Sequence, residues 1–123
     1  MVIGLVERDW QTRACLKAQL EEEGHNVSGL QTPRQALALV RRRILRPDLL
    51  ILDLAGQPSD ELPHFLDLAV LAPAAGVIVL KAPTLAGLPE VEARAERVLV
   101  RPFTVGDVAQ AVAEVAAGPV SEG

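Results

Sequence analysis

The sequence predicts an α/β fold in which a parallel sheet lies between two layers of helices. Short apolar runs alternate with segments whose apolar residues recur at helical spacing, and this alternation continues along the chain. Two of the runs, residues 49–52 and 77–80, contain only aliphatic side chains, so neither face of these strands suits contact with water. Because crossovers between parallel strands are right-handed, the intervening helices cover both faces of the sheet.

The first two predicted strands enclose one predicted helix. Residues 2–6 form an apolar run that ends abruptly in charged residues, as a buried strand does. Apolar residues then recur at helical spacing between residues 12 and 23, and Gly24 ends the helix because glycine accepts the conformation that follows a helix. Residues 26–30 predict a weaker strand.

The second helix is predicted to run from Pro33 to Arg46. Thr32 is a suitable N-cap, and proline is favoured at the first helical position. Pro47 ends the helix because proline restricts the residue before it. The predicted apolar face consists of Ala36, Leu37, Val40 and Ile44.

The second half of the chain continues the alternation. Residues 49–52 predict a buried strand that ends at Asp53, and residues 77–80 predict another that ends at Lys81. Pro83, Gly87 and Pro89 then interrupt the chain and leave room only for a short helix. The remaining predictions are a helix with the apolar stripe Leu62, Phe65, Leu66 and Ala69, the short helix at 90–94, a strand at 98–100, and an amphipathic helix at 105–115 that ends before Gly118-Pro119.

Length and charge restrict the classes of function. The 123 residues suffice for one domain with a buried core. We expect this domain to span residues 1–117, followed by a tail at 118–123 and no output domain. With 12 basic and 16 acidic residues the net charge is −4, which argues against a dedicated nucleic-acid or membrane binder because those partners are anionic.

The sequence also argues against cysteine-based sites and against segments that target a protein to or across a membrane. The single cysteine, Cys15, allows neither an internal disulfide nor a cysteine-based zinc site. The apolar runs fall short of the roughly 20 residues that span a bilayer, and charged residues begin at Glu7, so a signal peptide does not fit. We therefore expect a cytoplasmic protein.

Charged residues stand where the predicted strands end. In parallel α/β sheets, ligands bind beyond the carboxyl ends of the strands. The residues at those ends are Glu7, Arg8 and Asp9 after the first strand, Asp53 after the third, Lys81 after the fourth and Arg101 after the fifth.

At these positions the sequence resembles the receiver domain of bacterial two-component response regulators. Residues 6–13, 47–54, 77–82 and 100–103 carry the resemblance, which extends over about residues 1–117. It implies a flavodoxin-like (βα)5 fold, doubly wound, with strand order 2-1-3-4-5 and helices on both faces. It also implies that Asp53 occupies the phosphoacceptor position, that Glu7, Arg8 and Asp9 occupy the acidic magnesium-binding segment, and that Arg101-Pro102 replaces a lysine followed by a cis proline.

The sequence departs from the family pattern at positions that carry its chemistry. Arg8 replaces an acidic residue that contacts the metal, and Lys81 replaces the hydroxyl that contacts the phosphoryl group. The remaining departures are Val98 in place of a switching aromatic ring, Arg101 in place of lysine, and Pro58 one residue later than usual.

We expect these charges to cancel within one pocket. Glu7 and Asp53 face Arg8, Lys81 and Arg101, which gives a sum of about +1, or about zero if Asp9 also turns inward. Lys81 is expected to reach toward Asp53. Such a pocket has little attraction for a divalent cation that prefers oxygen ligands. Mg²⁺ is therefore expected to bind weakly or not at all, and no residue is assigned as a metal ligand.

These features favour an atypical receiver that acts as a protein-interaction module, with metal-dependent phosphorylation lost or weakened. It is not expected to be an enzyme, apart from residual self-phosphorylation at Asp53. The expected partner is a histidine kinase, a phosphotransfer protein, an output protein, or a second copy paired through residues 90–115. One alternative is a functional stand-alone regulator phosphorylated on Asp53. The other is a flavodoxin-like domain that binds an anion or small ligand, against which the lack of glycine in residues 7–12 counts.

Four other features receive structural interpretations. The arginines at 41–43 and 46 are expected to form a solvated helix end, where the helix dipole favours cations. His25 and His64 are expected at the surface, Cys15 in the core, and Trp10 as a partly covered surface ring.

Overall fold

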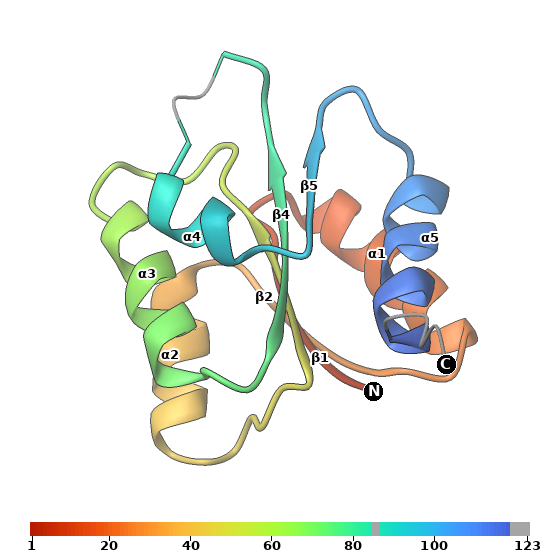
Figure 1. Cartoon of the computed structure of the whole chain (residues 1–123), viewed down its shortest axis with the longest axis horizontal. Coiled ribbons are helices and arrows are strands. Elements are labelled where there is room, and N and C mark those ends of the chain that lie inside the picture. Colours follow the sequence, from red (N-terminus) through yellow and green to blue (C-terminus); the bar gives the residue numbers. More distant parts are fainter. Residues whose placement is uncertain (85–86, 119–123) are drawn as a thin grey trace, which may run out of the picture.

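The computed structural model describes residues 1–84 and 87–118 and has the predicted α/β fold (Figure 1). One parallel sheet has the strand order β2-β1-β3-β4-β5. Its strands are β1 (Val2–Val6), β2 (Asn26–Leu30), β3 (Leu49–Asp53), β4 (Gly76–Lys81) and β5 (Arg97–Val100). The helices are α1 (Trp10–Glu22), α2 (Pro33–Arg41), α3 (Leu62–Leu71), α4 (Pro89–Arg94) and α5 (Val105–Ala117).

The sheet separates two apolar cores. Helices α1 and α5 cover one face, and α2, α3 and α4 cover the other (Figure 1). Because successive side chains of a strand point to opposite faces, Ile51 and Ile78 pack toward α1 and α5, whereas Leu52 and Val79 pack toward the other helices. None of the described helices is long and apolar enough to cross a bilayer. The predicted tail falls almost entirely on residues 119–123, which lie outside the described residues.

Helix α2 is shorter than predicted. It ends at Arg41 rather than Arg46, because Arg43 takes a left-handed conformation with φ of 57° and the chain turns away from the helix. The backbone N–H groups of Ile44 and Leu45 both donate to the Leu39 carbonyl oxygen, at 2.9 and 3.2 Å. Ile44 is consequently exposed and Leu45 buried, so the prediction that Ile44 lies on the apolar face was wrong.

Two predictions for α1 also need correction. The helix begins at Trp10, two residues before the predicted start, because Asp9 caps it by accepting from the backbone N–H of Thr12. Cys15 is exposed rather than in the core, since Leu16 and Leu20 form the buried stripe of this helix. Trp10 is 65% exposed at the start of the helix.

Candidate functional site

Three of the predicted residues meet at the carboxyl edge of the sheet. Asp53 is the last residue of β3, whereas Glu7 and Arg101 directly follow β1 and β5. Counting alternate residues back along each strand leads to Leu5, Ile51 and Leu99, which all pack in the core beneath α1 and α5. The three charged side chains therefore lie on the same side of the sheet.

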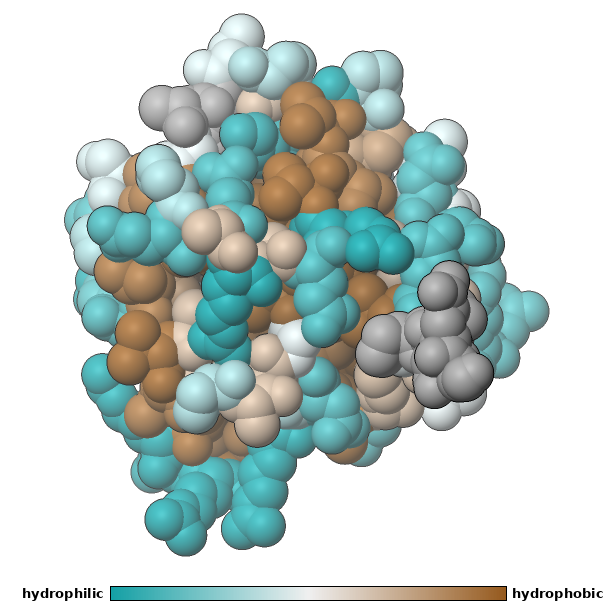
Figure 2. Space-filling view, viewed as in Figure 1, coloured by the Kyte–Doolittle hydropathy of each residue, from teal (hydrophilic) through white to brown (hydrophobic). Residues whose placement is uncertain are grey.

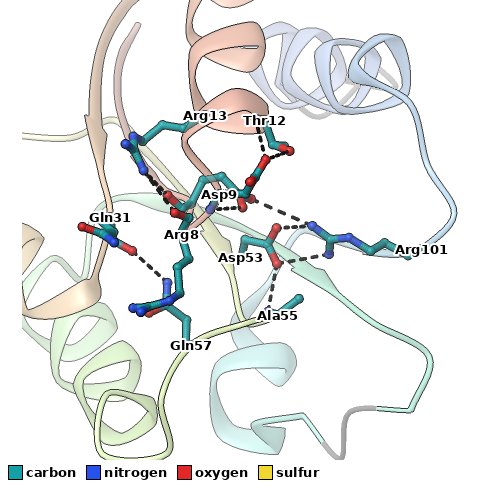
Figure 3. Close-up of polar contacts among 10 residues, drawn as sticks. Arg8, Asp9, Thr12, Arg13, Gln31, Asp53, Ala55, Gln57 and Arg101 are labelled. Carbon is teal, nitrogen blue, oxygen red and sulfur yellow. Dashed lines mark hydrogen bonds and ion pairs between the residues drawn. The ribbon is translucent and has the colours of Figure 1, made fainter.

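Arg101 holds the carboxylate of Asp53 with two nitrogens (Figure 3). Its Nη1 donates to Oδ1 at 3.2 Å, and its Nη2 donates to Oδ2. Asp53 Oδ1 also accepts from the backbone N–H of Ala55 at 2.9 Å. Asp53 is fully buried, whereas the Arg101 side chain is 33% exposed. Both oxygens of the predicted phosphoacceptor are thus engaged by a cation inside the protein.

The surroundings of Arg101 fix this orientation. Its guanidinium lies 4.8 Å from the centroid of the Phe103 ring, a distance at which a cation is attracted to the ring face. Hydrogen bonds to Asp53, the main cause, raise the pKa of Arg101 above its ordinary value. The Arg101–Pro102 peptide bond is cis, as the resemblance implied. The sequence analysis had assigned no role to Phe103, although it stands only two residues after Arg101.

Glu7 is a buried carboxyl beside this pair. Its Oε1 accepts from the backbone N–H of Asp9 at 3.0 Å, while its Oε2 lies 4.0 Å from Arg101 Nη2 and has no hydrogen-bond partner among the described residues. Burial, followed by the neighbouring Asp53 carboxylate, raises the pKa of Glu7 to about 8. Glu7 is therefore largely protonated at neutral pH, because one arginine does not compensate two buried carboxylates.

Asp9 caps α1 and does not turn inward. Its Oδ2 accepts from the backbone N–H of Thr12 at 2.9 Å and from the Thr12 hydroxyl at 2.7 Å. These two hydrogen bonds are the main cause that lowers the pKa of Asp9. The carboxylate thus stays ionised on the exposed N-terminus of the helix, where the dipole favours a negative charge.

The structure corrects the expected position of Arg8. Figure 3 shows its side chain directed away from the Asp53–Arg101 pair. It passes the next loop instead, where its Cδ would lie 3.9 Å from a Cβ added to Gly56. Residue 8 follows Val6 by two positions, and Val6 packs toward α2, α3 and α4, so Arg8 continues the other side of β1. Arg13, which the sequence analysis had not considered, holds this turn by donating to the Glu7 carbonyl oxygen at 2.7 Å.

Lys81 is also absent from the Asp53 pocket. Its Nζ forms an ion pair with Glu92 Oε1 on α4 at 2.8 Å, so the expectation that it reaches toward Asp53 was wrong. The reason is the strand register, since Asp53 is paired with Leu80, and Lys81 therefore points to the opposite face. The Lys81 ammonium is the main cause that lowers the pKa of Glu92. Val98 is 40% exposed on β5, and it shares the Lys81 face because its partner in β4 is Val79.

The resemblance raises the question of magnesium, which these residues do not fit. Arg8 stands at the second acidic position, and Asp9 caps α1. Glu7 is largely protonated at neutral pH and already accepts a backbone hydrogen bond, and the Arg101 guanidinium engages both oxygens of Asp53. A divalent cation would need several free oxygen ligands. Within the described residues, no group of three or more His, Cys, Asp or Glu side chains is placed to hold a metal ion.

No protein-family model matches the sequence, and no curated protein matches it. Solved structures, in contrast, resemble the fold over most of its length. A CheY-like receiver domain protein from Methanospirillum hungatei JF-1 has a TM-score of 0.77 and 15% identity, covering 93% of this chain and 92% of that one. The chain has the receiver-domain fold.

Two further receiver folds support this assignment. A response regulator from Thermotoga maritima has a TM-score of 0.72 and 21% identity, covering 95% of this chain and 98% of that one. The N-terminal domain of a response regulator/sensory box/GGDEF protein from Carboxydothermus hydrogenoformans has a TM-score of 0.75 and 22% identity, with coverages of 94% and 93%. The flavodoxin-like fold and the strand order implied by the resemblance are thus confirmed.

Proposed function

We propose that this chain is an atypical receiver module in two-component or phosphorelay signalling. It works by binding protein partners, and metal-dependent phosphorylation at Asp53 is lost or severely weakened. The observation that carries the proposal is the engagement of both Asp53 oxygens by Arg101. Nucleophilic attack on phosphorus needs a free carboxylate oxygen and neutralised phosphoryl oxygens. Here Arg101, the cation that could neutralise the phosphoryl oxygens, is already paired with Asp53, the nucleophile.

The contacts of α4 support a single conformational state. Glu92 binds Lys81 and also accepts from the backbone N–H of Leu88 at 2.8 Å, which fastens the start of α4 to the end of β4. At the other end of α4, Arg94 donates to the carbonyl oxygens of Ala69, Ala72 and Ala75 at the end of α3 and the loop that follows. Helix α4 is therefore held at both ends by contacts that do not involve Asp53.

The proposed partners are proteins, namely a histidine kinase, a phosphotransfer protein, an output protein or a second copy. A surface that suits such contacts lies on β5, an edge strand of the sheet. Val98 and Val100 are 40% and 43% exposed there, because the six residues of α4 cover only part of that face. Residues 90–115 include this surface and are the proposed site of pairing.

Phosphorylation is tested directly by intact mass. The chain is incubated with a small phosphodonor and Mg²⁺, and we expect no gain of a phosphoryl group. Mg²⁺ titration followed by emission of Trp10, which stands at the start of α1, should show no saturable change. A gain of one phosphoryl group that disappears in Asp53→Asn would overturn the proposal.

Three further variants test the physical reason. Arg101→Lys frees one oxygen of Asp53, and Arg8→Asp puts a short carboxylate at the position that the receiver resemblance assigns to a metal-binding acid. The double variant should therefore gain Mg²⁺ affinity and some phosphorylation. The same double variant carrying Asp53→Asn is the matched control and should gain no mass. Lys81→Thr alone should leave Mg²⁺ binding unchanged, because Lys81 is paired with Glu92 on the other face.

A further inference from the structure

A groove of about 710 Å³ lies at the amino ends of β3 and β4, at the opposite end of these strands from Asp53. One side is formed by the segment that leads from α2 into β3, with Val40, Arg41, Arg43 and residues 45–48 in the lining. The other side is formed by residues 71–75, which lead from α3 into β4. These segments enter strands, whereas Asp53 ends one, so the groove is independent of the site described above. Its volume is within the range of about 300–1,000 Å³ typical of ligand pockets.

The groove combines cationic walls with apolar surface. Arg41, Arg43 and Arg46 line it together with Leu45 and Leu71. Ile44 and Val70, which adjoin these lining residues in the sequence, are 66% and 70% exposed. Figure 2 shows hydrophilic side chains projecting at the lower end of the molecule, where α2 and α3 end, with apolar surface above them.

These arginines form a cluster of uncommitted cations, whereas the other cations of the described residues, apart from Arg8, are engaged within the protein. Lys17, Arg34, Lys81, Arg97 and Arg101 all form ion pairs, and Arg13 and Arg94 donate to carbonyl oxygens. Within residues 1–84 and 87–118, by contrast, the arginines at 41, 42, 43 and 46 make neither an ion pair nor a side-chain hydrogen bond. All four are exposed. Their guanidinium groups are available to an external ligand.

The backbone at Arg43 gives a second indication. Its φ of 57° lies in the left-handed region that follows many helices, where glycine is strongly favoured. A side chain at such a position works against stability, and an outlier of this kind points to a role for the side chain. The helix dipole accounts for cations in the last turn of α2, but Arg43 and Arg46 lie beyond the end of that helix.

We propose that this groove binds an acidic, amphipathic segment of a partner protein. Guanidinium groups hold carboxylates with paired hydrogen bonds, and the apolar lining accepts aliphatic side chains between them. Asp48, the one acidic residue of the lining among the described residues, is already engaged, because its Oδ2 accepts from the backbone N–H of Val2 at 2.8 Å.

Other anionic partners fit less well. Nucleic acids and anionic membranes are extended polyanions that would also meet the surface outside the groove, and that surface is acidic because the net charge of −4 already includes these four arginines. A short acidic segment contacts the groove alone. The groove lining contains no aromatic residue, whereas single-stranded nucleic acids are bound by stacking on aromatic rings and membrane interfaces by tryptophan and tyrosine.

Fluorescence anisotropy tests the proposal with a labelled helical peptide that has glutamates on one face and leucines on the other. Binding should weaken about tenfold or more in Arg41→Gln/Arg43→Gln/Arg46→Gln, and it should fall as salt is added. The matched control is Lys17→Gln/Arg34→Gln/Arg97→Gln, which also removes three charges, but from exposed side chains outside the groove, and should bind normally. Peptides with glutamine for glutamate, or serine for leucine, should bind weakly.

Arg43→Gly separates recognition from folding. The midpoint of its urea unfolding should rise, because glycine suits the left-handed backbone, while its affinity for the peptide falls. Equal affinity of the triple variant and the wild-type chain would overturn the proposal. So would binding of duplex DNA or phosphatidylserine vesicles, but not of the peptide, that depends on the arginines. Self-association lost in the triple variant would identify a second copy as the occupant and overturn the proposed partner.

Discussion

At the scale of single residues, Asp53 and Arg101 differ in their access to water. The Asp53 carboxylate is fully buried, while the Arg101 side chain is one-third exposed. Removing a partner from a buried ion pair is costly mainly because the remaining charge stays desolvated. The two halves of this pair should therefore respond unequally to substitution.

We predict that Arg101→Met destabilises the fold by about 3–5 kcal/mol at pH 7, since it leaves a buried carboxylate without a cation. Asp53→Asn should cost only about 1–2 kcal/mol, because Arg101 can turn toward solvent. Urea unfolding of both variants measures the difference. Arg97→Met, which breaks the exposed pair with Glu114, serves as control and should change stability by less than about 1 kcal/mol. Equal losses in the Asp53 and Arg101 variants would contradict this account.

At the scale of elements, one partly buried ion pair joins the end of β4 to α4, beside the packing of Val91 against Val77 and Val79. Lys81 and Glu92 are each about one-fifth exposed, at 20% and 19%. Lys17 and Glu21 form a matched pair within α1 that is much more exposed, at 41% and 46%. Partial burial reduces screening by water and salt, so the first pair should be the stronger.

Double-mutant cycles measure both coupling energies. Lys81→Met with Glu92→Gln should give a coupling of about 1 kcal/mol or more, because the pair is partly desolvated and Glu92 is also held by the Leu88 N–H. Lys17→Met with Glu21→Gln should give only about 0.3–0.5 kcal/mol. The α1 value should approach zero in high salt, while the α4 value should persist. Equal couplings would mean that α4 is not fastened through Lys81.

The sequence predicts the order of elements well because each strand is an apolar run and each helix has a periodic face. It also predicts which residues stand at the carboxyl edge of the sheet. Lys81 was expected near Asp53 because both residues stand at the ends of neighbouring strands. That expectation was wrong because it did not take into account to which face of the sheet each side chain points. Alternation along residues 77–81 places Lys81 with Val77 and Val79, but the register that pairs Leu80 with Asp53 is a tertiary property.

The early end of α2 shows another limit of local patterns. Apolar spacing continues to Ile44, and a proline stands at the next obvious stop, so the sequence favours a longer helix. The left-handed turn at Arg43 instead lets Leu45 enter the core. Arginine gives no local signal for such a turn, which glycine or asparagine would have given.

At the scale of the whole molecule, the protonated Glu7 links folding to pH. The side chain loses its proton near pH 4.5 when unfolded but only at about pH 8 when folded. Between these values the folded state holds one more proton than the unfolded state, so stability falls as pH rises. Below pH 4.5 the contribution of Glu7 to the free energy of unfolding no longer changes with pH. Above about pH 8 Glu7 is ionised in both states, and its destabilising effect has reached its full value.

We predict that, because of Glu7, the free energy of unfolding falls as pH rises from about 5 to 8. The slope should be at most about 1.4 kcal/mol per pH unit, the value for a single proton. Glu7→Gln, which has nearly the shape of the protonated acid, should remove this slope and be more stable than the wild-type chain at pH 8. Urea unfolding gives the free energy of unfolding of the wild-type chain and of the variant at each pH. Taking the difference between the two removes the effect of the histidines and surface carboxylates, which titrate in both chains. A difference that stayed constant with pH would mean that Glu7 is ionised in the folded protein. Arg101 would then be shared by two carboxylates, and the pocket would carry the excess negative charge that attracts a divalent cation.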